Sequence, residues 1–177
     1  MKFVIGFLFT VFVFHCNAQK IFINGKEGNR PLIWNDFSGK VDKSSEFNAV
    51  TYWGVKYNTA TKKDGATGKF TATIEFILEM DPKKSWVKKG KETDELLKHE
   101  QGHFNTGLLC LKELVAKTAN LTEVSESSFG KIQTLFFEIL AKYQKIDLQY
   151  DAETNHSENK IEQAKWNQFY ANELLKK

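Results

Sequence analysis

Two histidines four residues apart, His99 and His103, lie in the stretch LLKHEQGHFNTG, and Glu100 directly follows the first of them. Residues i and i+4 of a helix project from the same side one turn apart, so both imidazoles can bind one Zn²⁺. The glutamate then lies beside the metal, where a carboxylate takes a proton from an activated water and passes it to a leaving amine. This H-E-x-x-H spacing is typical of zinc metalloproteases. The alternative is an amphipathic helix whose polar edge carries two histidines and binds no metal.

A catalytic zinc site has three protein ligands and one open position, so a third ligand must come from elsewhere in the chain. Position 109, six residues after His103, is a leucine, so the compact H-E-x-x-H-x-x-G-x-x-H arrangement is absent. His156 is the favoured third ligand, because it is the only other histidine after residue 18 and imidazole suits zinc. The carboxylate alternatives are Asp151, Glu153, Glu123, Glu126 and Glu138.

Two residues shortly before His156 have candidate supporting roles. Ligating histidines usually donate their second N–H to a carboxylate or a carbonyl, and Asp151 is placed to accept it. Tyr150 is a candidate catalytic residue, because its hydroxyl can stabilise an oxyanion if it reaches the open metal position. The alternative for both residues is packing and capping at a helix joint.

We predict a zincin-like α+β fold, in which a small antiparallel sheet over residues 19–80 is followed by a helical half over residues 93–176. The segments AVTYWGVKYNTAT and GKFTATIEFILEM alternate apolar and polar residues, and KKDGATG joins them as a hairpin. KIFING is a further short strand, closed by a turn at Asn24 and Gly25. The strand over residues 70–80 either pairs with an extended peptide substrate or lies inside the sheet.

The helical half is predicted to begin near Thr93, an N-cap followed by two acidic residues in the first turn. Apolar residues then recur at helical spacing up to Val115. A second helix is expected over about residues 128–144 and a third over about residues 158–175. The polar stretch QYDAETNHS joins them, which puts His156 at or near the start of the third helix.

The first 18 residues are predicted to be a signal peptide that is cut after Ala18. The apolar run over residues 3–14 is too short to span a bilayer, and small or polar residues follow it. Lipid attachment at Cys16 is the less favoured alternative. The mature chain, residues 19–177, is then a single periplasmic or secreted domain without stable membrane insertion, and Cys110 is its one cysteine, so it has no internal disulfide.

The composition argues against a nucleic-acid partner. Hydrophobic residues make up 41% and charged residues 27% of the chain, as in an ordinary folded protein. The net charge is +3, but Arg30 is the single arginine, and arginine is the side chain that best recognises phosphates and base edges. The expected partner is a peptide or protein substrate, and the oligomeric state is left open.

The chain resembles the bacterial DUF922 family in LLKHEQGHF, YDAETNHS and QAKWNQF, preceded by WNDFSG and SWV. The resemblance spans most of the mature chain and implies an exported zinc-dependent protease. It implies that His99 and His103 bind the metal and that Glu100 is the catalytic carboxylate. It also implies that His156 is the third ligand, although the family usually has glycine where this chain has Ser157. The competing class is a non-catalytic, zinc-stabilised periplasmic binding or structural module.

Overall fold

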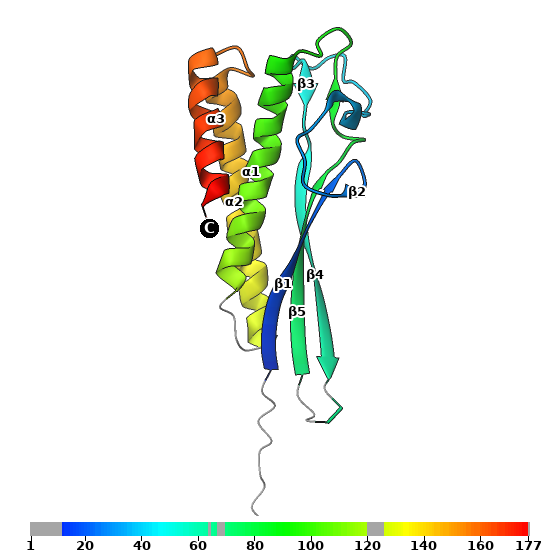
Figure 1. Ribbon diagram of the computed structural model, residues 1–177, viewed down its shortest axis with the longest axis vertical. Helices are drawn as coiled ribbons and strands as arrows, with labels where there is room; N and C mark the ends of the chain where they lie inside the picture. Colours follow the sequence, from blue (N-terminus) through cyan, green and yellow to red (C-terminus); the bar gives the residue numbers. More distant parts are fainter. Residues whose placement is uncertain (1–11, 64, 67–69, 120–125, 177) are drawn as a thin grey trace, which may run out of the picture.

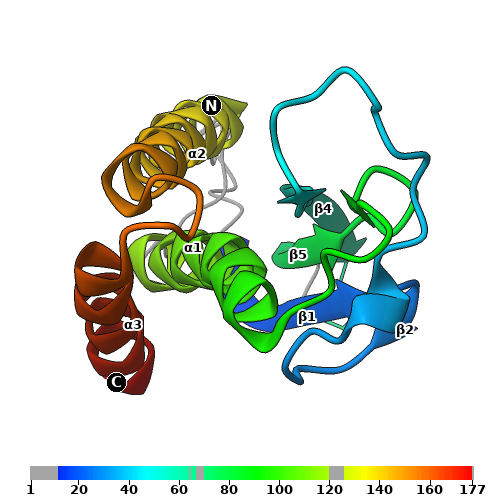
Figure 2. The same ribbon diagram turned by 90° about the horizontal axis from the view of Figure 1, so that it is seen from above.

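The computed structural model describes residues 12–63, 65–66, 70–119 and 126–176. In this part of the chain, a four-stranded sheet is covered on one face by three helices (Figures 1 and 2). The order of strands in the sheet is β2 (Lys26–Glu27), β1 (Phe12–Ile23), β5 (Phe70–Met80) and β4 (Trp53–Lys63). A second, two-stranded sheet consists of β3 (Ala49–Val50) and β6 (Trp86–Val87). The predicted α+β class is therefore confirmed.

The four-stranded sheet is mixed, so the expected wholly antiparallel sheet is wrong. Strands β4 and β5 do form the predicted antiparallel hairpin, paired from Trp53 with Met80 to Lys63 with Phe70. Strand β1, however, runs parallel to β5, because the chain crosses from one strand to the other instead of turning back at once. Strand β5 lies between β1 and β4 and is an interior strand of this sheet, and its residues 76–80 keep both neighbours if the chain is cut after Ala18.

Strand β1 continues across the proposed cleavage site. Ala18 pairs with Glu75 and Gln19 pairs with Phe76, so a cut between them would leave residues 19–23 against residues 76–80. Residues 1–11 of the proposed signal peptide lie outside the described residues. Among the described helices, none is long and apolar enough to cross a membrane.

The three helices are α1 (Asp94–Thr118), α2 (Glu126–Thr154) and α3 (Lys160–Leu175). The predicted N-cap of α1 is confirmed, because the Thr93 hydroxyl accepts the N–H of Leu96 at 3.2 Å. Helix α2 continues well beyond the expected end at residue 144, so most of the expected polar joint forms its last turns. Asn159 caps α3, which therefore begins two residues later than expected.

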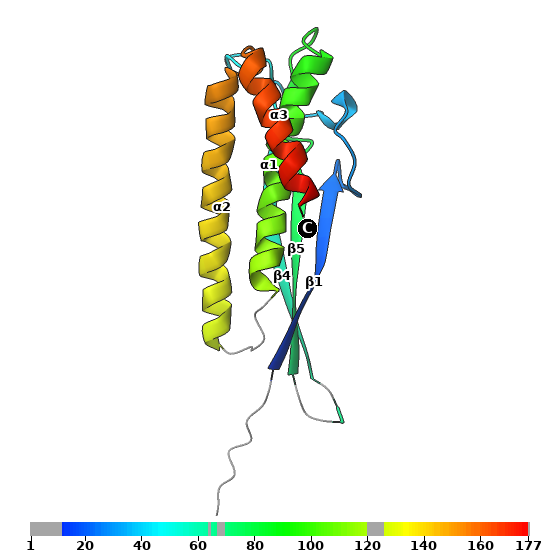
Figure 3. The same cartoon turned by 60° about the vertical axis from the view of Figure 1, so that its left-hand side comes forward.

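The core lies between the sheet and α1. Helix α1 contacts β1, β4 and β5 and also packs against both other helices, with α3 crossing it and α2 running alongside (Figure 3). Alternating residues of β5 face this layer, as the sequence predicts, and are fully buried: Ala72, Ile74, Phe76 and Leu78. Each buried Ile, Leu or Phe side chain contributes about 1.5–3 kcal/mol, so α1 is held firmly at the centre of the molecule.

The single arginine, which is exposed, pairs with a buried carboxylate. Arg30 donates two hydrogen bonds, of 2.8 and 2.6 Å, to the carboxylate of Asp36, the last residue of a 3₁₀ turn, η1 (Trp34–Asp36). Burial alone would raise the pKa of Asp36, but the hydrogen bonds from Arg30 and from the Ile33 N–H outweigh it and lower that pKa. Gln101 of α1 accepts the nearby Leu32 N–H at 2.7 Å, which ties this loop to the helix carrying the histidines.

Candidate metal centre

The histidine pair lies near the start of α1, at the end of the molecule where α2 ends and α3 begins (Figure 1). His99, Glu100 and His103 are all buried. The start of α1 therefore meets the joint between α2 and α3, a segment far from it in the sequence.

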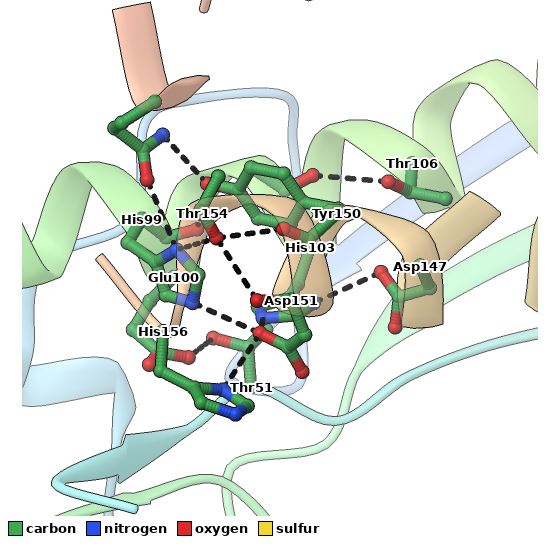
Figure 4. Close-up of polar contacts among 12 residues, drawn as sticks. Thr51, His99, Glu100, His103, Thr106, Asp147, Tyr150, Asp151, Thr154 and His156 are labelled. Carbon is green, nitrogen blue, oxygen red and sulfur yellow. Dashed lines mark hydrogen bonds and ion pairs between the residues drawn. The ribbon is translucent and has the colours of Figure 1, made fainter. Parts of the chain in front are cut away.

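One oxygen of Asp151 lies among His99, His103 and His156 (Figure 4). Asp151 Oδ1 is 3.1 Å from His99 Nε2 and 3.1 Å from His103 Nε2. It is also 3.2 Å from His156 Nδ1. The two oxygens of a carboxylate share about four lone-pair sites, so a single oxygen cannot accept three N–H groups well. A cation among these atoms would satisfy the oxygen and the nitrogens together.

The distances suit a metal ion. Ligand atoms about 2.0–2.1 Å from a tetrahedral zinc lie about 3.3 Å from one another, close to the separations around Asp151. His99, Asp151 and His156 form a group whose ligand atoms all lie within 4.8 Å of one another, and such a group could hold a metal ion. His103 is outside that most compact group but faces the same carboxylate oxygen.

Hydrogen bonds to Gln163 assign the tautomer of His99. Gln163 Nε2 donates to the Tyr150 hydroxyl at 2.8 Å and to Asn167 at 3.0 Å, so its other terminal atom is the amide oxygen. That oxygen is 3.0 Å from His99 Nδ1 and accepts its N–H. With Nδ1 protonated, Nε2 is the nitrogen that faces Asp151, and it can hold either a proton shared with that carboxylate or a metal ion.

Asp147 has the same role for His103, with His103 Nδ1 donating to Asp147 Oδ1 at 2.9 Å. Sequence reasoning missed Asp147 and Gln163, which lie 44 and 64 positions from the histidines that they contact. The available signals were weak: Asp147 precedes Asp151 by one helical turn, and Gln163 begins the stretch QAKWNQF. Partners of this kind orient metal-ligating histidines.

The carboxylates of Asp147 and Asp151 favour positive charge in the cluster. Burial alone would lower the pKa of His103, but its hydrogen bonds to Asp147 and Asp151 outweigh that effect and raise the pKa well above its ordinary value. Burial alone would raise the pKa of Asp151, but hydrogen bonds from His103 and His99 outweigh it and hold the pKa far below its usual range. Asp151 is thus an ionised carboxylate at the centre of the cluster.

A turn of unusual backbone conformation brings His156 to this carboxylate. Asn155, His156 and Ser157 have φ values of 45°, 51° and 79°, all in the left-handed region. The His156 N–H donates to the Asp151 carbonyl at 3.2 Å, which closes the turn over the end of α2. His156 is therefore between the last two helices rather than at the start of α3, and its ring packs on Phe47 with centroids 4.5 Å apart.

Glu100 is held beside the cluster by a residue that the sequence did not indicate. The Thr51 hydroxyl donates to Glu100 Oε2 at 2.7 Å, and both residues line the same cavity as the histidines. Burial raises the pKa of Glu100. A raised pKa suits a carboxylate that must both take and return a proton.

Tyr150 is placed differently from the expected oxyanion-stabilising residue. Its hydroxyl donates to the His99 carbonyl at 2.9 Å and accepts from Gln163, and its side chain is fully buried. Its ring stacks on the His99 imidazole at a centroid distance of 4.8 Å, and it does not line the cavity. Tyr150 therefore fits a role in positioning His99 rather than a catalytic role.

The cluster of His99, His103, His156 and Asp151 opens into a cavity of about 300 Å³ that is also lined by Glu100 and by the segment 46–51, which contains β3. Two of the other carboxylates considered as ligands, Glu138 and Glu153, do not line it. Glu153 is exposed and bonded to Gln149 and Trp166, and Glu138 is exposed farther along α2. Glu123 and the side chain of Glu126 lie outside the described residues.

The fold and the site define an α+β protein with a His/Asp group suited to a metal ion. The chain belongs to the DUF922 family, described as "Bacterial protein of unknown function", whose model matches residues 34–157. The resemblance noted in the sequence is thus confirmed, and the match includes the three histidines, Glu100 and Asp151. Comparisons with curated proteins and with solved structures give no match.

Proposed function

We propose that this protein is an exported zinc-dependent hydrolase of zincin type that cleaves peptide bonds. The main support is the position of Asp151 Oδ1, within 3.2 Å of a nitrogen of each of the three histidines. A buried glutamate from the same helix as two of those histidines lies beside them. Metal binding alone does not require this glutamate, whereas hydrolysis does.

His99, His103 and His156 are the proposed zinc ligands. The ion would supply a Lewis acid that lowers the pKa of a water molecule and polarises a substrate carbonyl. Asp147 and Gln163 hold two of the imidazoles with Nε2 directed at the ion.

Glu100 is the proposed general base. It takes a proton from the attacking water and returns it to the leaving amine. Thr51 fixes Oε2 of this glutamate, which leaves Oε1 to act on the water. Tyr150 stacks under His99 and keeps that ligand in place.

A specific observation favours a second candidate, the non-catalytic module. With Asp151 as a ligand, the site would have four protein ligands and no open position, as structural zinc sites do. If Asp151 is not a ligand, the three histidines leave the fourth position open for water or substrate, as catalytic zinc sites do. The two candidate functions make different predictions: the hydrolase cleaves peptides and needs Glu100 to do so, whereas the non-catalytic module cleaves none.

Cleavage of unstructured peptides, followed by mass spectrometry, tests the proposal. The zinc-loaded wild type should cleave them, and Glu100→Gln should keep its zinc but lose at least about 100-fold in rate. Glu95→Gln, which removes an exposed carboxylate from the first turn of the same helix, is the matched control and should keep full activity. Zinc-bound wild type that cleaves nothing would favour the non-catalytic module.

A further inference from the structure

The cavity beside the histidine cluster is acidic, although the protein as a whole is basic. Five carboxylates line it and no lysine or arginine does, while the whole chain carries 25 basic and 22 acidic residues. Glu100 accepts a hydrogen bond from Thr51, and Asp147 and Asp151 contact the histidines of the cluster. The other two, Glu46 and Glu158, are exposed.

Glu46 and Glu158 have no cationic partner in the described part of the chain. Glu158 accepts a hydrogen bond from the Asn155 side chain at 3.1 Å, and neither carboxylate is in an ion pair there. They approach the cavity from different segments, one just before β3 and the other just after the His156 turn. They therefore add negative charge at the cavity that no side chain of the described chain neutralises.

Strand β3 offers a backbone edge at the same cavity. In the described residues its single strand neighbour is β6. The Asn48 carbonyl accepts the Lys88 N–H at 2.7 Å, so Asn48 faces β6. Backbone groups alternate along an antiparallel strand, so the N–H and C=O of Ala49 point from the opposite edge. Ala49 and the residues on either side of it line the cavity.

We infer that this cavity binds an extended peptide paired with the free edge of β3, and that Glu46 and Glu158 select a lysine or arginine side chain on it. The inference rests on the proposed hydrolase function and names its substrate class. Strand addition positions the peptide backbone, and the side chains beside the edge determine its specificity. Because β3 is short, it offers few backbone hydrogen bonds, and the two carboxylates carry most of the discrimination between peptides.

Peptide binding to the zinc-loaded Glu100→Gln protein tests this inference without turnover. Three labelled peptides of about eight residues would be identical except for a central Lys, Gln or Glu, and fluorescence anisotropy would give each dissociation constant. An exposed ion pair is worth about two- to fivefold in affinity, so the Lys peptide should bind on the order of tenfold more tightly than the Gln peptide. The Glu peptide should bind most weakly.

The double substitution Glu46→Gln and Glu158→Gln should abolish the preference for lysine while keeping the amide oxygen that Asn155 can use. Glu138→Gln is the matched control, about 20 Å along α2 from Asp151, and should leave the preference unchanged. The backbone amides of the Lys peptide would also be methylated one at a time. Methylation should weaken binding at every second position only, because alternate amides face the β3 edge.

Equal binding of the Lys and Glu peptides, or a lysine preference that survives the double substitution, would overturn the inference. Uniform effects of amide methylation would overturn the strand pairing. Zinc content and cleavage measured with the wild-type protein test the proposed function separately. Cleavage without a lysine preference would therefore remove this inference alone.

Discussion

Asp147 and Gln163 determine which nitrogens the two α1 histidines present to Asp151. Each accepts the Nδ1–H of one imidazole, at 2.9 and 3.0 Å, and so directs Nε2 toward the shared carboxylate oxygen. Without these acceptors, either ring could rotate or change tautomer, and the nitrogens would no longer converge. The geometry of the site therefore depends on two residues that do not themselves bind the proposed metal.

Replacing Asp147 by alanine should weaken zinc binding about 10- to 100-fold, because His103 loses the acceptor that orients it. Asp147→Asn, which keeps an acceptor oxygen but loses the charge, should have a smaller effect. Competition with a chromophoric chelator measures the zinc affinity of both variants. Leu148→Ala, at an exposed neighbouring position on α2, is the control and should bind zinc as the wild type does. An unchanged zinc affinity in Asp147→Ala would contradict the orienting role.

Gly102 lets α1 approach the ring of Tyr150. A Cβ atom at this position would clash with the hydroxyl end of Tyr150, which is fully buried and cannot move freely. We expect Gly102→Ala to destabilise the fold by about 1–3 kcal/mol, as overpacking in a core does, in urea denaturation. Gly130, in α2, has no atom near its Cβ position, so Gly130→Ala should instead stabilise by about 0.5–1 kcal/mol. Equal changes in the free energy of unfolding at the two glycines would show that a clash with Tyr150 does not cause the destabilisation.

Among the elements, those with clear periodicity could be predicted from the sequence. The alternating β4–β5 hairpin and α1 with its Thr93 cap are examples, because local propensity and tertiary packing agree there. The last turns of α2 could not, since they are largely polar and Tyr150 is their one large, fully buried side chain. The parallel pairing of β1 with β5 depends on contacts between distant segments, for which a single sequence carries no local signal.

The backbone of the turn between α2 and α3 is strained, and this strain can be tested. Ser157 has a φ of 79°, a region that costs a residue with a Cβ atom about 1–2 kcal/mol. Ser157→Gly removes this cost but adds about 0.5–1 kcal/mol of unfolded-state entropy, so a net stabilisation of about 0.5–1 kcal/mol is expected in urea denaturation. Ser157→Ala, which keeps the Cβ atom, is the control and should not stabilise. If both variants have the same stability, the strain at this turn is absent.

Over the whole molecule, the site exists because the sheet and three helices bring distant segments to one end. His99 lies 52 positions from Asp151, and Glu100 lies 49 positions from Thr51. Sequence reasoning identified His99, Glu100, His103 and His156 as candidates because their residue types and local spacing carry chemistry. It could not identify Thr51, Asp147 or Gln163, because ordinary polar residues become informative only after folding places them against a histidine or a glutamate.

Cys110 reports on unfolding of the core between α1 and the sheet. It is fully buried in α1, and burial raises the pKa of its thiol to about 12. Since the thiolate is the reactive form, the native protein of residues 19–177, in which Cys110 is the one cysteine, should not react with a thiol-specific disulfide reagent at pH 8. In denaturant the pKa returns toward its ordinary value, and one thiol per chain should react within minutes. Fast labelling of the native protein would contradict the packing of α1 against the sheet and the other helices.

The most direct test of the proposed metal centre is the zinc content of residues 19–177, purified without a histidine tag and without added metal, by elemental mass spectrometry. We expect about one zinc per chain in the wild type, retained in Glu100→Gln and reduced in His156→Ala. That pattern would establish His156 as a ligand and separate binding from catalysis. A wild-type protein that holds no zinc, even after incubation with it, would contradict the metal centre and leave His99 and His103 as two buried histidines of an ordinary helix.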